Sequence, residues 1–130
     1  MDKKMILLIM SRKILSDALI AQTQDDMRFE LCADQNYDAA VGTAISYKPE
    51  VVVVEVPESG NWRSAERCLG ICDAIRKQVA GCKQVLLCCE SDVDSCRAAI
   101  QAKQENRIDD FLFYDTSVNY LLCKLESLLQ

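Results

Sequence analysis

The amino-acid sequence predicts one α/β domain built on a parallel sheet, and three observations lead to this fold class. Short apolar runs alternate five times with longer amphipathic stretches along the chain. At least three of these runs are continuously hydrophobic, which is typical of parallel strands covered on both faces. The 130 residues include only 4 Gly and 2 Pro, so the core must come from long regular elements, and the length fits a single domain over residues 1–130.

Five strands are expected where the apolar runs fall. The first and third runs contain no polar residue, and the third consists of four consecutive valines. Valine is enriched in strands because its branched side chain packs well on a pleated surface. In chain order, the predicted strands cover residues 5–10, 29–33, 51–54, 85–89 and 108–114.

Five helices are expected to follow the strands, and capping or helix-breaking residues mark several of their ends. Small polar side chains cap the first turn of a helix, whereas proline and glycine stop it. The expected starts are Asn36 for the second helix, Ser91 or Asp92 for the fourth and Thr116 or Ser117 for the fifth, and the expected stops are Pro49 for the second and Gly81 for the third.

The helices should turn their apolar residues toward the sheet, because these residues recur at the spacing of one helix face. The positions expected to be buried are Ile14, Leu15, Ala18 and Leu19 in the first helix; Ala40, Ala44 and Ile45 in the second; Ala65, Cys68, Leu69, Cys72, Ile75 and Val79 in the third; Val93, Cys96 and Ile100 in the fourth; and Val118, Leu121, Leu122, Leu125 and Leu128 in the fifth.

The alternation of strands and helices predicts a three-layer (βα)5 sandwich, since crossovers between parallel strands are almost always right-handed. The commonest five-stranded solution is the flavodoxin-like order 2-1-3-4-5. In that topology a functional site lies at the carboxyl ends of the strands, where the first and third strands diverge.

Composition excludes several classes of protein. The net charge of -5 and the pI of about 4.7 argue against direct nucleic-acid contact by this domain. The longest apolar run spans residues 5–10, far short of the roughly 20 residues that cross a bilayer, so no membrane segment is expected. The 8 cysteines, in a chain without a recognisable export signal, are expected to be thiols in the cytoplasm. With no His and no Cys-x-x-Cys pair, no metal site is expected.

Residues 49–55, Pro-Glu-Val-Val-Val-Val-Glu, resemble the third strand of response-regulator receiver domains (the CheY-like superfamily). In that family the segment reads Pro-Asp, four apolar residues and then the phosphoacceptor Asp. The likeness extends over essentially the whole chain. It implies the following equivalences: Glu55 for the phosphoacceptor, Met10 and Ser11 for the Mg²⁺-binding acidic pair, Cys89 for the Thr or Ser switch residue, Phe111 for the switch aromatic and Tyr114 for the lysine.

Except for the aromatic Phe111, these residues depart from the family pattern. The departures predict a degenerate receiver, a pseudo-receiver, that lacks phosphoryl chemistry. Mg²⁺ prefers oxygen ligands, and a Met thioether with a neutral Ser hydroxyl cannot replace two carboxylates. Arg12 adds a positive charge where a cation would bind, and it is a candidate ion-pair partner for Glu55. We therefore expect no enzyme activity and no cofactor. Glu55 either imitates part of the charge of a phosphorylated state or serves only as a structural carboxylate.

The resemblance implies a signalling role through protein contact, with a protein partner or an output domain. In the family, the fourth helix, fifth strand and fifth helix carry dimerisation and output. Here that surface comprises residues near 93–106, 111–114 and 118–129, which makes a homodimer through it a candidate assembly. Because the fifth helix has more apolar positions than a narrow buried stripe requires, Leu122, Leu125 or Leu129 is expected to be free for a partner.

Two other classes remain open as alternatives. A redox-sensitive or cofactor-carrying flavodoxin-like module would use Cys89 or a phosphate-binding loop after the first strand, where Ser11 supplies one hydroxyl. A cysteine-phosphorylated transport subunit shares the strand-helix rhythm, but it requires a cysteine just after the first strand, where Met10 and Ser11 stand.

Overall fold

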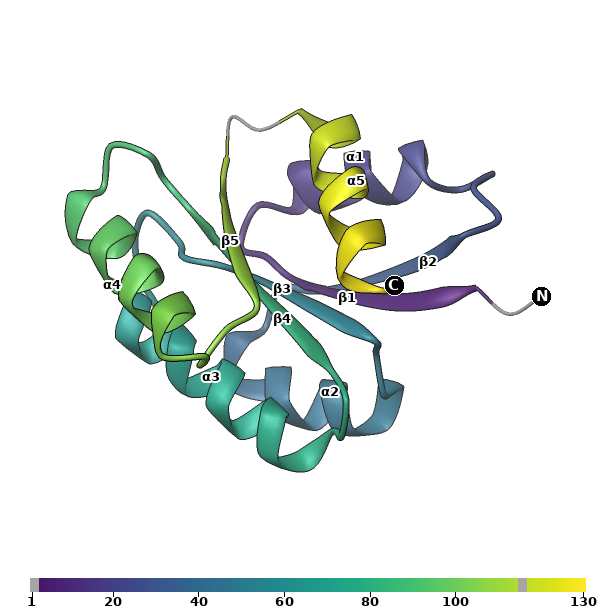
Figure 1. The fold of residues 1–130 in the computed structure, drawn as a ribbon. Helices are drawn as coiled ribbons and strands as arrows, with labels where there is room; N and C mark the ends of the chain where they lie inside the picture. The colour runs from purple at the N-terminus through teal and green to yellow at the C-terminus, as the bar shows by residue number, and fades with distance from the viewer. Residues whose placement is uncertain (1–2, 115–116) are drawn as a thin grey trace.

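The computed structural model describes residues 3–114 and 117–130, and it contains five strands and five α-helices in strict alternation. Figure 1 shows their arrangement. A short 3-10 helix precedes α2. The elements are β1 (Lys4–Ile9), α1 (Lys13–Gln22), β2 (Phe29–Asp34), η1 (Tyr37–Ala39), α2 (Ala40–Tyr47), β3 (Val51–Glu55), α3 (Ala65–Gln78), β4 (Lys83–Cys88), α4 (Val93–Gln104), β5 (Asp110–Phe113) and α5 (Val118–Leu128).

The strands form one parallel sheet in the order β2-β1-β3-β4-β5, which confirms the predicted flavodoxin-like topology. The register places Val54 between Ile9 of β1 and Leu86 of β4. The carboxyl ends of the three central strands therefore meet at one edge of the sheet. Glu55, the last residue of β3, lies at this edge, where a parallel sheet of this order positions a functional site.

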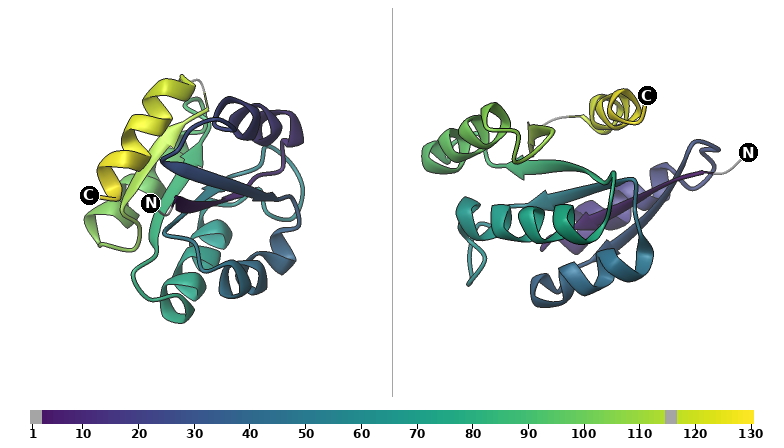
Figure 2. Two further views of the ribbon diagram at one scale, coloured as in Figure 1. Left: turned by 90° about the vertical axis from the view of Figure 1, so that its right-hand side faces the viewer. Right: turned by 60° about the horizontal axis from the view of Figure 1, so that its bottom comes forward.

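Helices cover both faces of the sheet and create two apolar cores. Helices α1 and α5 lie on one face, and α2, α3 and α4 lie on the other (Figures 1 and 2). Successive residues of β1 alternate between the two cores: Ile6 and Leu8 face α1 and α5, whereas Leu7 and Ile9 face the opposite side. All five residues of β3 are buried, which explains its uninterrupted valine run.

Side-chain caps define several helix starts. The side chains of Ser64, Asp92 and Ser117 accept hydrogen bonds from backbone N–H groups in the first turns of α3, α4 and α5. The start of α4 was predicted at Ser91 or Asp92, and Asp92 is the cap. The start of α5 was predicted at Thr116 or Ser117; Ser117 is the cap, and Thr116 lies outside the described residues. Asn36 caps the 3-10 helix rather than α2 itself.

The predicted buried face of α4 was wrong. Val93 and Ile100 are 56% and 45% exposed, and the residues that face the sheet are Ser95, Ala99 and Ala102. Small side chains allow the helix axis to approach the strands closely, so a weakly hydrophobic face is buried and the larger apolar residues are left outside. A periodicity based on large apolar residues selects the neighbouring stripe instead.

The buried faces of α1 and α2 also differ from the prediction. Ile14 is 87% exposed and Ala18 is exposed, whereas Ser16 is buried. Burial of this hydroxyl is tolerated because it donates to the Lys13 carbonyl at 3.1 Å. In α2, Ile45 is 42% exposed, so the two alanines of that helix make its contact with the sheet.

The expectation that α5 leaves leucines free for a partner was wrong for two of the three residues. Leu122 and Leu125 are buried in the core under α1 and α5, and Leu129 is half-buried against the same core. Within the described residues, α1 and α5 are the two helices on this face, and α1 contributes only one fully buried apolar side chain, Leu19. A broad leucine face on α5 is therefore needed to cover the sheet.

None of the helices within residues 3–114 and 117–130 combines the length and apolar character that a membrane span requires.

Gln84 of β4 is a buried polar side chain whose replacement should stabilise the fold. The residue is fully buried, and its amide oxygen and nitrogen have no hydrogen-bond partner among the described residues. An unsatisfied buried amide costs about 1–3 kcal/mol. We expect Gln84→Met, which preserves the volume, to raise the free energy of unfolding by about 1 kcal/mol in urea titrations. The exposed Gln78→Met variant should be neutral, and a destabilised Gln84→Met protein would contradict this account.

Candidate functional site

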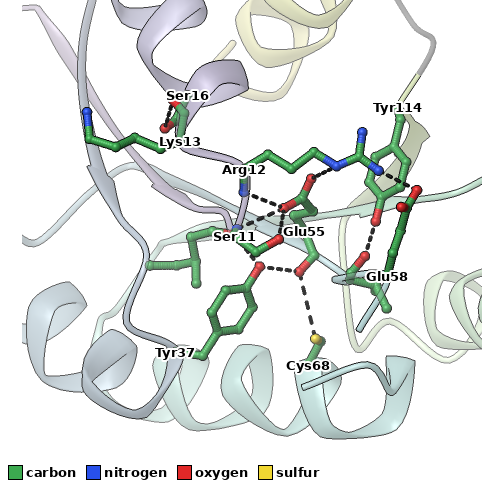
Figure 3. A network of polar contacts seen from close by, with 11 residues as sticks. Ser11, Arg12, Lys13, Ser16, Tyr37, Glu55, Glu58, Cys68 and Tyr114 are labelled. Carbon is green, nitrogen blue, oxygen red and sulfur yellow. Dashed lines mark hydrogen bonds and ion pairs between the residues drawn. The ribbon is translucent and has the colours of Figure 1, made fainter. Parts of the chain in front are cut away.

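A buried carboxylate lies at the carboxyl edge of the sheet. Glu55 is 0% exposed, and its Oε1 accepts hydrogen bonds from the N–H of Ser11 at 2.8 Å, the hydroxyl of Ser11 at 2.7 Å and the N–H of Arg12 at 3.3 Å (Figure 3). The loop after β1 thus wraps around the end of β3. Hydrogen bonds to an ionised acceptor are stronger than neutral ones, so this contact fixes the loop firmly.

The second oxygen of this carboxylate faces a single cation. Nε of Arg12 lies 3.6 Å from Oε2 of Glu55, and Oε2 has no hydrogen-bond partner within the described residues. The guanidinium of Arg12 also pairs with Glu58, and it stacks 4.3 Å from the centre of the Tyr114 ring. One positive charge therefore serves two carboxylates and one aromatic face (Figure 3).

Tyr114 closes the site from the β5 side. Its hydroxyl donates to the backbone carbonyl of Val56, and its ring lies beneath the guanidinium of Arg12. Burial and the nearby Glu55 charge raise the pKa of Tyr114 well above its usual range, so the side chain is a neutral phenol. It supplies a hydrogen bond and an aromatic surface, but no positive charge.

Tyr37 joins the carboxyl ends of β1 and β3, although no sequence pattern marks it as a site residue. Its buried hydroxyl lies 2.6 Å from the carbonyl oxygen of Glu55 and 3.3 Å from that of Ile9, so one donor is shared between β3 and β1. Burial is the main reason that the pKa of Tyr37 is raised far above normal. The ring packs 5.9 Å from that of Trp62.

The remaining predicted site residues do not converge on Glu55. Met10 is fully buried in the core under α1 and α5. Cys89 is half-buried, with Sγ 3.0 Å from Oγ of Ser91, and Phe111 packs beside Phe113 against the other core. The structure therefore joins Ser11, Arg12, Glu55 and Tyr114 through polar and cation–ring contacts, and within the described residues Met10, Cys89 and Phe111 make no hydrogen bond or ion pair with Glu55.

A cleft opens next to this cluster, between the loops that follow β3 and β4. Its volume is about 500 Å³, and Glu58, Cys89, Val93 and Tyr114 are among the residues that line it. Within the described residues, no group of three or more His, Cys, Asp or Glu side chains is arranged to hold a metal ion.

The chain resembles solved structures of response regulators. No protein-family model and no curated protein matches it. A DNA-binding response regulator of the LuxR family from Staphylococcus aureus is 18% identical, with a TM-score of 0.77 over 98% of this chain and 99% of that chain. A response regulator from Thermotoga maritima is 17% identical, with a TM-score of 0.75 over 97% of both chains. An orphan response regulator of H. pylori is 14% identical, with a TM-score of 0.77 over 99% of this chain and 98% of that chain.

These similarities establish the fold. The chain has the architecture of response-regulator receiver domains: a five-stranded parallel sheet in the order 2-1-3-4-5 between two helical layers.

The buried carboxylate of Glu55 should contribute far more to stability than the exposed carboxylate of Glu58. In Glu55→Gln, the amide cannot satisfy the Ser11 donors and the Arg12 guanidinium together. We expect a loss of about 2 kcal/mol in the free energy of unfolding, measured by urea titration. The side chain of Glu58 is 64% exposed, so Glu58→Gln should lower the free energy of unfolding by less than about 1 kcal/mol. Equal losses in the two variants would show that the hydrogen bonds around Glu55 are not stabilising.

Proposed function

We propose that this chain is a receiver-like signalling module that acts through protein contacts and does not require aspartyl phosphorylation. One observation carries the proposal: the guanidinium of Arg12 lies 3.6 Å from Oε2 of Glu55 and stacks on the ring of the neutral Tyr114. The receiver architecture supports a place in signal transduction. The side chains at its carboxyl edge support a role other than phosphoryl transfer.

The Mg²⁺ ion implied by the receiver fold does not fit the residues present. Mg²⁺ demands oxygen ligands in near-octahedral geometry. Oε1 of Glu55 already accepts three hydrogen bonds, Oε2 faces the Arg12 guanidinium, and Met10 lies in the core. A phosphoryl group would also need a cation to balance its oxygens, and Tyr114 is neutral.

The same contacts favour a structural role for Glu55 over imitation of a phosphate. The carboxylate is fully buried, and its charge is taken up by the loop after β1 and by Arg12. Little of that charge is available to act on the surface of the protein. The preferred interpretation is therefore that Glu55 fixes the loops of a docking scaffold.

Exposure to acetyl phosphate and Mg²⁺ tests the loss of phosphoryl chemistry. We expect the intact mass of the protein to remain unchanged, because a carboxylate that is already hydrogen-bonded and ion-paired is a poor nucleophile without a metal. The variant with Ser11→Asp, Arg12→Ala, Glu55→Asp and Tyr114→Lys, in which the buried Met10 is left unchanged, should gain one phosphoryl group in a Mg²⁺-dependent manner. Labelling of Glu55 in the unmodified protein would overturn the proposal.

The face formed by α4, β5 and α5 is the best-supported docking surface. It carries Val93, Ile100 and Tyr120 as exposed large side chains. Asp110 of β5 pairs with Lys103 of α4 at 3.0 Å and with Lys124 of α5 at 3.1 Å. Burial opposes ionisation of Asp110, but the hydrogen bonds from both lysines and from a backbone N–H outweigh it and lower the pKa of this carboxyl group. The three elements are thus joined into one unit.

This face is proposed to bind a protein partner, an output domain or a second copy of the chain. Ile100→Glu should abolish concentration-dependent self-association, measured by light scattering, because it places a charge in the apolar contact. It should not reduce the unfolding temperature, since Ile100 is 45% exposed. Ile45→Glu on α2, at a similar exposure of 42%, is the matched control and should associate normally. Identical behaviour of the two variants would argue against this face as the homodimer interface.

A redox role has less support than a docking role. All 8 cysteines are free thiols, which suits a cytoplasmic protein. Burial is the main cause that raises the pKa of Cys68 and of Cys88 to about 12, so both remain as unreactive thiols. Cys89 and Cys123 are more accessible, and Cys89 is followed directly by the acidic Glu90.

A further inference from the structure

Arg12 and Tyr114 come from distant parts of the sequence and meet face to face over the end of β3. The guanidinium lies 4.3 Å from the ring centre, while the hydroxyl at the far end of the ring donates to the Val56 carbonyl (Figure 3). The ring is therefore held at two points. One is a hydrogen bond at its tip, and the other is a cation on its face.

The backbone of Tyr114 is also hydrogen-bonded at this end of the sheet. Its N–H donates to the Cys88 carbonyl at 3.0 Å, and the N–H of Val56 donates to the Leu87 carbonyl at 2.9 Å. The tips of β3, β4 and β5 are thus hydrogen-bonded in series. If the Tyr114 ring swung outward, the bond to Val56 and the terminal bond between β5 and β4 would be the first to weaken.

Arg12 is held in place by two carboxylates and one aromatic ring, although its side chain is 41% exposed. If its guanidinium swung into solvent, Oε2 of the buried Glu55 would lose its only ion-pair partner in the described structure. An uncompensated buried charge is strongly unfavourable. The outer pair with Glu58 is exposed and screened by salt, so the inner contacts with Glu55 and Tyr114 decide where Arg12 lies.

We propose that Arg12 is a latch that keeps the Tyr114 ring closed against the end of β3 and so holds the β5 tip and the adjacent cleft in one conformation. The cleft shares Tyr114 with the site and also includes Cys89 and Val93, the first residue of α4. An opened ring would widen the cleft and free the β5 tip. This goes beyond the proposed docking function, because it concerns the conformation of the free protein.

Hydrogen exchange and thiol labelling of Arg12→Ala test the latch. We expect the amide of residue 114 to exchange at least about tenfold faster than in the unmodified protein, because local opening sets the exchange rate of such a terminal amide. Alkylation of Cys89 by iodoacetamide, followed by peptide mass spectrometry, should also accelerate. The exposed Cys123 on α5 should be labelled at an unchanged rate.

Matched variants separate the latch from general destabilisation. Lys13→Ala removes the neighbouring exposed cation, which pairs only with Asp17 in the described structure, and should leave both readouts unchanged. Glu58→Gln should have a small effect. Tyr114→Phe keeps the ring under Arg12 but removes the tether to Val56, so residue 114 should exchange faster than in the unmodified protein and Cys89 should be labelled faster.

Two results would overturn the proposal. One is unchanged exchange at residue 114 in folded Arg12→Ala protein. The other is faster exchange that extends equally to core amides such as that of Ile75, since a uniform increase reports lower global stability. If Arg12→Ala does not fold, Arg12→Lys decides the question, because it keeps a positive charge beside Glu55 but loses the planar guanidinium that stacks on the Tyr114 ring. Neither readout involves a partner, so the latch and the docking role can fail separately.

Discussion

The structure depends on how a fully buried carboxylate is accommodated at the edge of the sheet. Glu55 is surrounded by three hydrogen-bond donors from the loop after β1 and by one guanidinium. Without them, the charge would be too costly to bury. This requirement draws Ser11 and Arg12 toward β3, and Arg12 in turn draws Glu58 and the ring of Tyr114 together. The loops at the carboxyl edge are therefore organised from within.

In the proposed function, this organisation gives the edge of the receiver fold a use other than phosphoryl transfer. A phosphoryl-transfer site needs open coordination positions and a cation that can follow the developing charge. Here the cation is the guanidinium of Arg12, which is part of the chain, and Oε1 of Glu55 already accepts three hydrogen bonds. The docking proposal follows from this difference, because the remaining features that can act are surfaces, above all the exposed apolar side of α4.

The sheet order and the position of Glu55 could be predicted from the sequence, because continuous apolar runs mark buried parallel strands and their ends fall together. The inward face of α4 could not be predicted, since Ser95, Ala99 and Ala102 carry almost no hydrophobic signal. Tyr37 was missed because its partners lie 18 and 28 residues away. The stacking of Arg12 on Tyr114 depends on side-chain conformations that no local pattern encodes. The family equivalences of the site residues stay predictions.

The contact between Tyr37 and Trp62 has an optical consequence. Trp62 is the only tryptophan in the sequence, and its ring lies 5.9 Å from a tyrosine whose hydroxyl touches the carbonyls of both Ile9 and Glu55. The guanidinium of Arg67 also lies over the indole ring, 4.7 Å from its centre. The protein thus contains a single tryptophan in contact with the tyrosine that joins the ends of β1 and β3, and rearrangements there should alter the tryptophan emission without any added label.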